Sequence, residues 1–476
     1  MAPVGTTAAE LPRGRYWFAF ALVTSLFFTW GFAYGLLDVL NAHFQVVFGI
    51  NKLQSTLLQF AYFGAYFFFA PLGSIFMDRY GYKKGIHLGL TLYSLGAIFF
   101  WPSAKYEKYG GFVGCTFVIG TSMLAVSRIA KTSYHLSPCS GCGLSCLEVA
   151  ANSYISVLGS PKYAAARLNF SQGFQGVASF AGPMIGSRWF FQGKNATTLD
   201  TVQWVYLAVA VLGLMLNFLF YFCDLPEISG DALAEEMHDA GIVSDEEPFY
   251  KQWRCIFGWV AQTCYTGAQV GVASLAVNYM SEQGVGISEG KASQFLSYCQ
   301  ITFTVGRFVG VGILHFVDPA LLLSFYAVAC SAFSLGVAFS PGKAGIGCLF
   351  TLFFFESICY PVIFTLATKN LGRHTKRGSG LVVMGVGGGA WYPPAQGSIA
   401  DRNTRLSYIV PFTGYVAMAV YAIGIVISQT LTDGFRFRTV DEIAERKKTI
   451  TEREEGGQTT PDSEKGAKDD VYVERV

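Results

Sequence analysis

Charged residues are scarce in this chain of 476 residues. Asp, Glu, Lys and Arg make up 14% of it, whereas 52% is hydrophobic and 16% is aromatic. The mean hydropathy is +0.38. A soluble protein of this length needs more charge on its surface, so the composition excludes one and predicts a polytopic membrane protein. The formal net charge of +2 gives no basis for binding nucleic acid.

Metal-binding patterns are also scarce. The pair Cys139 and Cys142 has the spacing of a metal or redox motif, but no second pair or histidine set completes a site. The eleven cysteines are odd in number and lie mostly within apolar segments, which argues against a disulfide framework. We expect no metal, no cofactor and no obligatory protein partner.

Apolar runs of about 20 residues, the length that crosses a bilayer core of ~30 Å, are abundant instead. The first half has runs at 16–40, 53–77, 85–101, 111–127 or 141–158, 168–191 and 202–223. The second half has runs at 251–280, 292–316, 319–339, 343–367, 378–399 and 407–430. This pattern predicts an all-α membrane protein of 12 transmembrane helices in two six-helix bundles, which is typical of a transporter and not of an enzyme.

The polar segments between these runs predict the domain organisation. We expect a cytosolic N-terminus at 1–15, bundles at 16–223 and 251–430, an acidic cytosolic loop at 224–250, and a charged, largely disordered tail at 431–476. Residues 1–15 have no apolar core of a signal peptide, so the first span directs insertion.

Basic residues in short loops predict the orientation in the membrane. Those after spans two, four and ten fall on one side together with both termini: Arg79, Lys83, Lys84, Lys162, Arg167, Lys369, Arg373, Lys376 and Arg377. The positive-inside rule places this side in the cytosol, and we expect the plasma membrane. The sequon at Asn195 then lies outside and is a candidate for glycosylation, whereas the sequon at Asn169 begins a span and is unusable.

Glu148 is the most informative residue, because it is a carboxylate within an apolar run of small residues. An ionisable group at this depth costs roughly 2.5–3.5 kcal/mol, so a function is the default hypothesis. At helical spacing, Ser145, Asn152 and Ser156 lie on the same face as Glu148.

Three further spans carry polar stripes. They contain Asn169, Gln172 and Ser179; Gln262, Tyr265 and Gln269; and Ser293, Ser297, Gln300, Thr304 and Arg307. Within a bilayer such stripes face one another or a watery cavity. We favour contacts between helices for the Ser and Thr positions, and a cavity for Glu148, Asn169, Gln262 and Gln269. Carboxamides and carboxylates suit a neutral polyol, and Trp30, Tyr34, Tyr265 or Tyr360 can stack on a sugar.

Two more carboxylates lie within spans. Asp38 has no basic residue within a turn or two, which favours a group that takes up and releases a proton, although a permanent salt bridge with Arg307 is an alternative. Glu356 lies four residues before Tyr360, on the same predicted helical face. It is a second proton site, a partner for sugar hydroxyls or a counter-charge for Arg307, and the sequence leaves these open.

The segment from Ser74 to Lys84 resembles the Gly-x-x-x-Asp-Arg-x-Gly-Arg-Lys signature of the major facilitator superfamily, with Ser74 in place of glycine. The resemblance implies a conformational latch at Asp78 and Arg79, with which we group Arg307. The alternative is that these charges only set the topology.

Longer stretches of 16–430 resemble the fucose:proton symporter branch of that superfamily. They include Phe28-Thr29-Trp30-Gly31 leading to Asp38, Cys146-Leu147-Glu148, Arg167-Leu168-Asn169, Gly306-Arg307-Phe308 and Tyr360-Pro361. The resemblance implies that Asp38 carries the coupled proton and that Glu148 recognises sugar. Departures at Tyr34, Ala273 and Glu356 leave the sugar open.

We therefore predict a proton-coupled symporter of L-fucose or a related hexose that works by alternating access. The substrate site is expected to comprise Glu148, Asn152, Asn169, Gln172, Gln262, Tyr265, Gln269, Tyr34 and Tyr360. A facilitative uniporter or exchanger of another small polar solute is the alternative within this fold. A non-transporting nutrient receptor is a third, but its enlarged cytosolic tail is missing, since only 46 residues follow position 430.

Residues 121–140 have no counterpart in the resembled family. If both flanks crossed the membrane separately there would be thirteen spans, and the basic loops would change sides. We interpret the segment as translated intron sequence or a splice variant, and an abundant transcript that retains it would contradict this. If the segment is genuine, we expect a loop that distorts span four.

Overall fold

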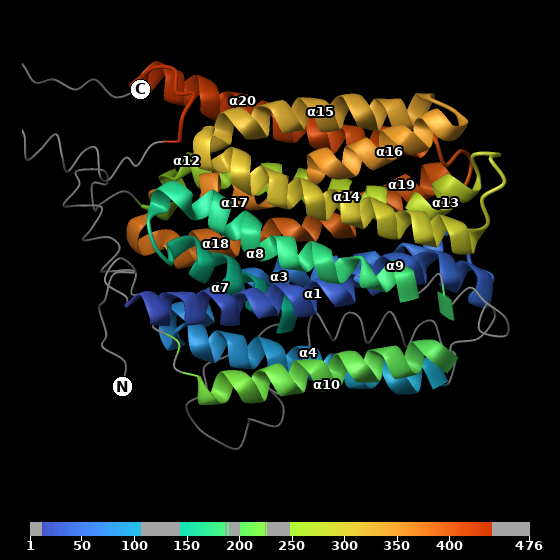
Figure 1. The fold of residues 1–476 in the computed structure, drawn as a ribbon, viewed down its shortest axis with the longest axis horizontal. Helices are drawn as coiled ribbons and strands as arrows, with labels where there is room; N and C mark the ends of the chain where they lie inside the picture. Colours follow the sequence, from blue (N-terminus) through green and yellow to red (C-terminus); the bar gives the residue numbers. More distant parts are fainter. Residues whose placement is uncertain are drawn as a thin grey trace, which may run out of the picture.

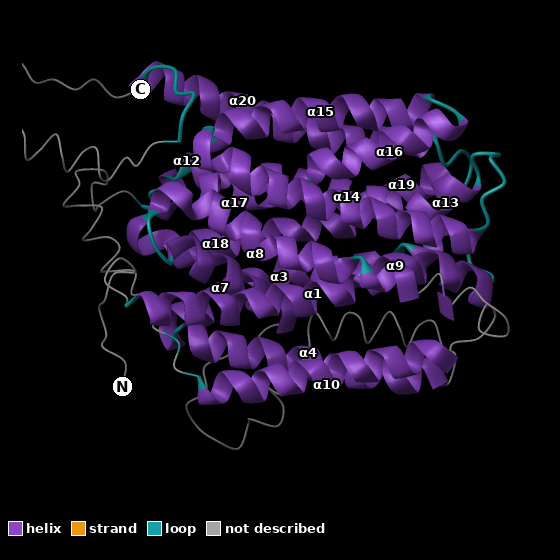
Figure 2. Ribbon diagram, in the orientation of Figure 1, coloured by secondary structure: helices purple, strands orange, loops and turns teal. Residues whose placement is uncertain are grey.

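The structure, a computed structural model, describes residues 12–105, 143–185, 188–189, 200–223, 225 and 248–439. Over these residues the regular structure is helical, apart from one isolated antiparallel bridge between Val317 and Arg438 (Figure 2). The segment 121–140, the sequon at Asn195, most of the acidic loop and the tail beyond 439 lie outside the described residues.

The first half of the chain forms long helices that run side by side (Figure 1). Helix α4 packs along α10 and α7, and α1 packs along α8. The elements are α1 (Arg13–Phe48), α2 (Lys52–Ser55), α3 (Leu57–Tyr80), α4 (Tyr82–Lys105), α7 (Gly143–Val157), η3 (Pro161–Tyr163), α8 (Ala164–Ser179), α9 (Ala181–Ile185) and α10 (Asp200–Phe222).

The second half is built in the same way. Helices α12 and α15 pack on α20, and α14 packs on α16. The principal elements are α12 (Trp253–Ser274), α13 (Ala276–Ser281), α14 (Glu289–Phe316), α15 (Pro319–Phe339), α16 (Gly342–Glu356), α17 (Cys359–Ala367), α18 (Thr375–Met384), η8 (Gly385–Ala390), α19 (Tyr392–Ala400) and α20 (Ile409–Asp433).

In the second half of the chain, three runs predicted as single spans are interrupted. Run 251–280 breaks at Leu275, run 343–367 breaks between α16 and α17, and run 378–399 is divided by the 3-10 helix η8. At the second break Pro361 has no N–H to donate to the carbonyl of Ser357, which weakens the helix there. These breaks lie in the part of the second half that surrounds the cavity described below.

Apolar side chains on the outer helices identify the lipid-facing surface. Met215 and Phe218 of α10 are 65% and 68% exposed, and Val420 of α20 is 69% exposed. Such a surface suits acyl chains and not water. Five described stretches are long and apolar enough on their own to cross a bilayer: Gln203–Phe222, Glu289–Phe316, Pro319–Phe339, Gly342–Ala367 and Leu406–Thr432.

The start of α1 and the end of α20 lie at the same end of the molecule, at the left in Figure 1. There the ring of Tyr163 stacks on that of His315 from the second half, with centroids 4.7 Å apart. The amide of Asp318 donates to the carbonyl of Phe437 at 2.9 Å, so the chain after α20 is bonded to the turn between α14 and α15. Helices α2 and α19 meet near the opposite end.

Candidate substrate cavity

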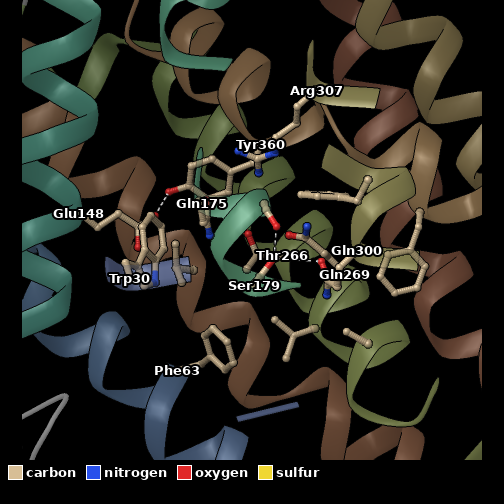
Figure 3. Close-up of a pocket in the computed structure, with 16 residues that line it drawn as sticks. Trp30, Phe63, Glu148, Gln175, Ser179, Thr266, Gln269, Gln300, Arg307 and Tyr360 are labelled. Carbon is tan, nitrogen blue, oxygen red and sulfur yellow. Dashed lines mark hydrogen bonds between the residues drawn. The ribbon is translucent and has the colours of Figure 1, made fainter. Parts of the chain in front are cut away.

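A cavity with both polar and apolar lining residues lies between helices of the two halves (Figure 3). Its lining includes one carboxylate, Glu148 of α7, and one guanidinium, Arg307 of α14. Three carboxamides also face it, from Gln175 of α8, Gln269 of α12 and Gln300 of α14. Both halves of the chain therefore supply hydrogen-bonding groups to one space.

Aromatic and hydroxyl side chains complete the cavity. The aromatic residues of the lining are Trp30, Phe63, Phe303, Phe353 and Tyr360, and the hydroxyl residues besides Tyr360 are Ser179 and Thr266. Aromatic faces bind the apolar side of a ring-shaped solute, while hydroxyls and carboxamides bind its polar groups. The combination is typical of a small, neutral, hydroxyl-rich ligand.

Glu148 is bonded to the second half of the chain. Its side chain is buried, with 1% exposure, and its Oε1 accepts a hydrogen bond from the hydroxyl of Tyr360 on α17. Asn152, one turn later on α7, donates to the same oxygen at 3.4 Å. A buried carboxylate requires such donors, because its charge is otherwise costly to remove from water.

The network continues from Asn152 to Arg307. Asn152 Oδ1 accepts from Gln172 Nε2 at 3.1 Å, and Gln172 Oε1 accepts from Arg307 Nη1 at 2.9 Å. The guanidinium of Arg307 also lies over the ring of Phe303, 4.7 Å from its centroid. Three side chains, those of Arg307, Gln172 and Asn152, thus connect α14 of the second half to Glu148 of the first.

Helices α1 and α8 approach one another closely beside the cavity. A Cβ atom on Gly31 would lie 2.1 Å from the carbonyl oxygen of Gln175, and one on Gly35 would lie 2.2 Å from that of Ser179. Only glycine permits this contact between backbones. It holds α1, which carries Trp30, against the helix that carries Gln175 and Ser179.

The structure brings six of the nine expected substrate residues together. Glu148, Gln269 and Tyr360 line the cavity. Asn152 and Gln172 belong to the network behind it, and Asn169 Nδ2 donates to the backbone carbonyl of Arg307 at 2.7 Å. Asn169 is fully buried.

The other three substrate residues do not lie in the described lining. Gln262 is buried and its Nε2 donates to Thr266 Oγ1 at 3.4 Å. The hydroxyl of Tyr265 donates to the backbone carbonyl of Glu356 at 2.7 Å. Tyr34 lies on α1, as does Asp38, but the side chains of both are outside the described part of the structure.

Glu356 occupies a separate buried position. Its side chain is 0% exposed, and its Oε1 accepts a hydrogen bond from the hydroxyl of Tyr415 on α20. Glu356 and Tyr360, expected on one helical face, lie on either side of the break between α16 and α17 and have different partners. Among the described residues that line the cavity, Glu356 is not present.

The latch residues lie in two places. Asp78 at the end of α3 is 3.5 Å from Arg377 Nε on α18, a contact between the two halves. The guanidinium of Arg79 lies 5.6 Å from the centroid of the neighbouring Tyr80 ring. Arg307 instead lines the cavity and takes no part in the contact between Asp78 and Arg377.

Several lining residues were not predicted as substrate residues, namely Gln175, Gln300, Ser179, Thr266 and Arg307. Ser179 and Gln300 belong to the polar stripes and bond each other at 3.2 Å, but they were not assigned to the site. Gln175 follows Gln172 by three residues, and Thr266 precedes Gln269 by three. Helical spacing from the predicted residues is the signal that points to both.

Comparison with known proteins decides the family. Residues 18–394 match the family model of the Major Facilitator Superfamily. The chain belongs to the major facilitator superfamily. It is thus a multi-pass membrane transporter and not an enzyme, and the prediction of an all-α facilitator fold is confirmed.

Two curated relatives extend over most of the chain. A glucose/galactose transporter of Brucella abortus is 31% identical over 417 residues, which are 86% of this chain and 94% of that protein. The L-fucose-proton symporter of Escherichia coli is 30% identical over 429 residues, 86% of this chain and 93% of that protein. The predicted resemblance to the fucose:proton symporter branch is confirmed.

Solved structures agree with this assignment. The Escherichia coli fucose:proton symporter superposes with a TM-score of 0.65 at 28% identity, over 86% of this chain and 98% of that one. The proton:xylose symporter XylE superposes with a TM-score of 0.62 at 15% identity, over 91% of this chain and 99% of that one. At that lower identity, the second match shows the shared fold alone.

Proposed function

We propose that this transporter is a proton-coupled symporter of a monosaccharide, L-fucose or a related hexose. The observation that carries the proposal is the cavity, in which a buried carboxylate, three carboxamides and several aromatic rings converge from both halves. These groups complement the hydroxyls and the apolar face of a neutral sugar. The names of the relatives, which specify fucose in one case and glucose or galactose in another, support a hexose.

Asp38 is the proposed site of the coupled proton. It lies on α1 one turn after Gly35, which contacts the backbone of Ser179, so α1 joins the proposed proton site to the cavity wall. Protonation and sugar binding would together favour the state that reopens to the inside, through their different affinities for the two states. Glu356, buried and bonded to Tyr415, is the candidate for a second proton.

We propose that both termini face the cytosol and that the plasma membrane is the site of transport. In support, the start of α1, the end of α20 and the basic residues Lys162 and Arg377 lie at one end of the molecule. The positive-inside rule assigns that end to the cytosol. Loss of mass on deglycosylation, abolished by Asn195→Gln, would place the loop after span five outside.

Uptake of radiolabelled sugar into proteoliposomes tests the function. We expect L-fucose, D-glucose or D-galactose to accumulate with an inward proton gradient and not without one. Asp38→Asn should abolish accumulation but leave facilitated diffusion of sugar down its own concentration gradient. Glu148→Gln should abolish sugar binding. Unchanged gradient-driven uptake in Asp38→Asn would exclude its role in coupling.

The same assay separates the alternatives. Saturable uptake at the same rate with and without the proton gradient would identify a uniporter or an exchanger. Binding of sugar without any uptake by reconstituted protein would identify a receptor. Either result would overturn the proposed symport.

A further inference from the structure

The hydrogen-bond network between Arg307 and Glu148 has a fixed direction. A guanidinium donates hydrogen bonds and cannot accept them, so Gln172 must present Oε1 to Arg307. Its Nε2 is then the atom that faces Asn152, which must present Oδ1 in return. Asn152 Nδ2 is left to face Glu148 Oε1 at 3.4 Å and the hydroxyl of Tyr360 at 3.2 Å.

Each carboxamide in this chain of bonds therefore has one orientation that satisfies both neighbours. Turning Gln172 over would set N–H groups against the guanidinium and an oxygen against Asn152 Oδ1. Turning Asn152 over would set its oxygen against the carboxylate of Glu148. All four side chains are at most 2% exposed, so water is poorly placed to replace the lost partners.

We propose that Arg307 is a positioning residue for Glu148, acting through Gln172 and Asn152. By fixing both carboxamides, Arg307 keeps a donor directed at the carboxylate that binds the sugar. The inference rests on the proposed function, because it assigns sugar binding to Glu148. It adds a residue on α14 that sets the affinity of a site on α7 without touching Glu148.

The position of Arg307 makes this control dependent on closure of the two halves. Helix α14 packs on α8 through tight contacts, such as that between Gly176 and Thr304. The backbone of Arg307 is bonded to Asn169 of α8 at 2.7 Å, and its side chain is bonded to Gln172 of the same helix. When α8 and α14 separate, Gln172 loses the partner that fixes its orientation. The hydrogen bond that Glu148 receives from Asn152 therefore depends on contact between the two halves.

A double-mutant cycle tests the inference. Affinity for the sugar that the wild type transports is measured by isothermal titration calorimetry on wild type, Arg307→Met, Gln172→Met and the double variant. We expect each single change to weaken binding by about tenfold, and the double variant to bind within about twofold of the weaker single variant. Losses that multiply in the double variant would show that Arg307 acts directly on the sugar or through another group, and would overturn the inference.

Conservative variants separate positioning from folding. Arg307→Lys keeps a donor for Gln172 and should restore most of the affinity lost in Arg307→Met. Gln172→Glu keeps the contact with Arg307 but has no N–H for Asn152, so it should bind as weakly as Gln172→Met. Wild-type affinity in Gln172→Glu would contradict the fixed direction.

Gln396→Met is the matched control, since Gln396 of α19 is also a fully buried glutamine but belongs neither to this network nor to the described lining of the cavity. It should bind with wild-type affinity. The two proposals fail in different ways. If the wild type binds none of L-fucose, D-glucose or D-galactose, the proposed function is refuted. If the wild type binds a sugar but the losses in Arg307→Met and Gln172→Met are additive in the double variant, only the role of Arg307 is refuted.

Discussion

Two buried carboxylates have contrasting surroundings at the scale of single residues. Glu148 lines the cavity and is bonded to Tyr360, whereas Glu356 is bonded to Tyr415 away from the described lining. Each carboxylate receives a tyrosine hydroxyl from a different helix. The placement favours sugar recognition for Glu148 and proton binding without sugar contact for Glu356.

Tyr360→Phe should weaken sugar binding by about tenfold or more, because a hydrogen bond to a charged group contributes ~1.5–3 kcal/mol. Calorimetric titration measures the change. Tyr408→Phe is the control, since the hydroxyl of Tyr408 is also buried but donates to the carbonyl of Val272. Equal losses in the two variants would mean that the effect is general and does not depend on Glu148.

Glu356→Gln should leave sugar affinity within about twofold of wild type, as expected for a substitution outside the binding contacts. The glutamine can still accept from Tyr415 but cannot take up a proton. Accumulation driven by a proton gradient should therefore fall while equilibrium binding persists. A large loss of affinity would instead place Glu356 among the sugar contacts.

The sequence predicts some site residues and not others for a physical reason. Glu148 is conspicuous because a carboxylate is costly within an apolar run. Its partner Tyr360 is 212 residues away, and the bond between them depends on how α7 and α17 pack. Periodicity along one helix describes a face, but it does not say which face of another helix lies opposite.

At the scale of helices, the contact between α1 and α8 depends on the absence of side chains. Gly31 and Gly35 allow the two backbones to touch beside the cavity. The predicted spans find most helices, because the apolar runs needed to cross a bilayer are long. They miss the breaks at Leu275 and within 385–390, because apolar and small residues continue through both.

Gly35→Ala should lower thermal stability and sugar affinity together. Its new Cβ would lie 2.2 Å from the carbonyl oxygen of Ser179, so α1 must move away from the cavity wall. Overpacking of this kind costs ~1–3 kcal/mol. Thermal unfolding in detergent, followed by sugar titration, measures both effects.

Gly312→Ala is the control for that substitution, because a Cβ on Gly312 of α14 meets nothing within 4 Å. Alanine there should stabilise the helix by about 0.5–1 kcal/mol. If Gly35→Ala were as stable as Gly312→Ala and bound sugar equally well, the close contact would not constrain the site.

At the scale of the whole molecule, contacts between the halves lie at both ends of the cavity. Lys52 of α2 reaches into the second half, where its Nζ is 2.7 Å from Glu282 Oε1, 2.8 Å from Thr404 Oγ1 and 3.2 Å from the carbonyl of Ala400. The Lys52 side chain is 17% exposed, and that of Glu282 is 44% exposed. At the other end, Asp78 and Arg377 are 3.5 Å apart with side chains 34% and 59% exposed.

Lys52→Met should open the end of the molecule that holds Lys52. Charge-assisted hydrogen bonds contribute ~1.5–3 kcal/mol, which is about a 10- to 100-fold shift toward the open state. Spin labels at Val46 and Arg402, in a background with reactive cysteines replaced, should report longer distances. Lys291→Met removes a lysine exposed on α14 and should leave the distances unchanged, and equal lengthening in both variants would contradict the role of Lys52.

The Lys52–Glu282 and Asp78–Arg377 contacts differ in exposure, so ionic strength should weaken one more than the other. Salt weakens the attraction between exposed charges, over a screening length of about 10 Å at 0.1 M and about 3 Å at 1 M, but it acts weakly on partly buried ones. Raising the salt concentration should therefore loosen Asp78 from Arg377 before it loosens Lys52 from Glu282. Spin labels at Lys84 and Lys251 should then separate, while those at Val46 and Arg402 should not. The ionic strength of the medium would thereby change the side of the membrane to which the sugar-free transporter opens.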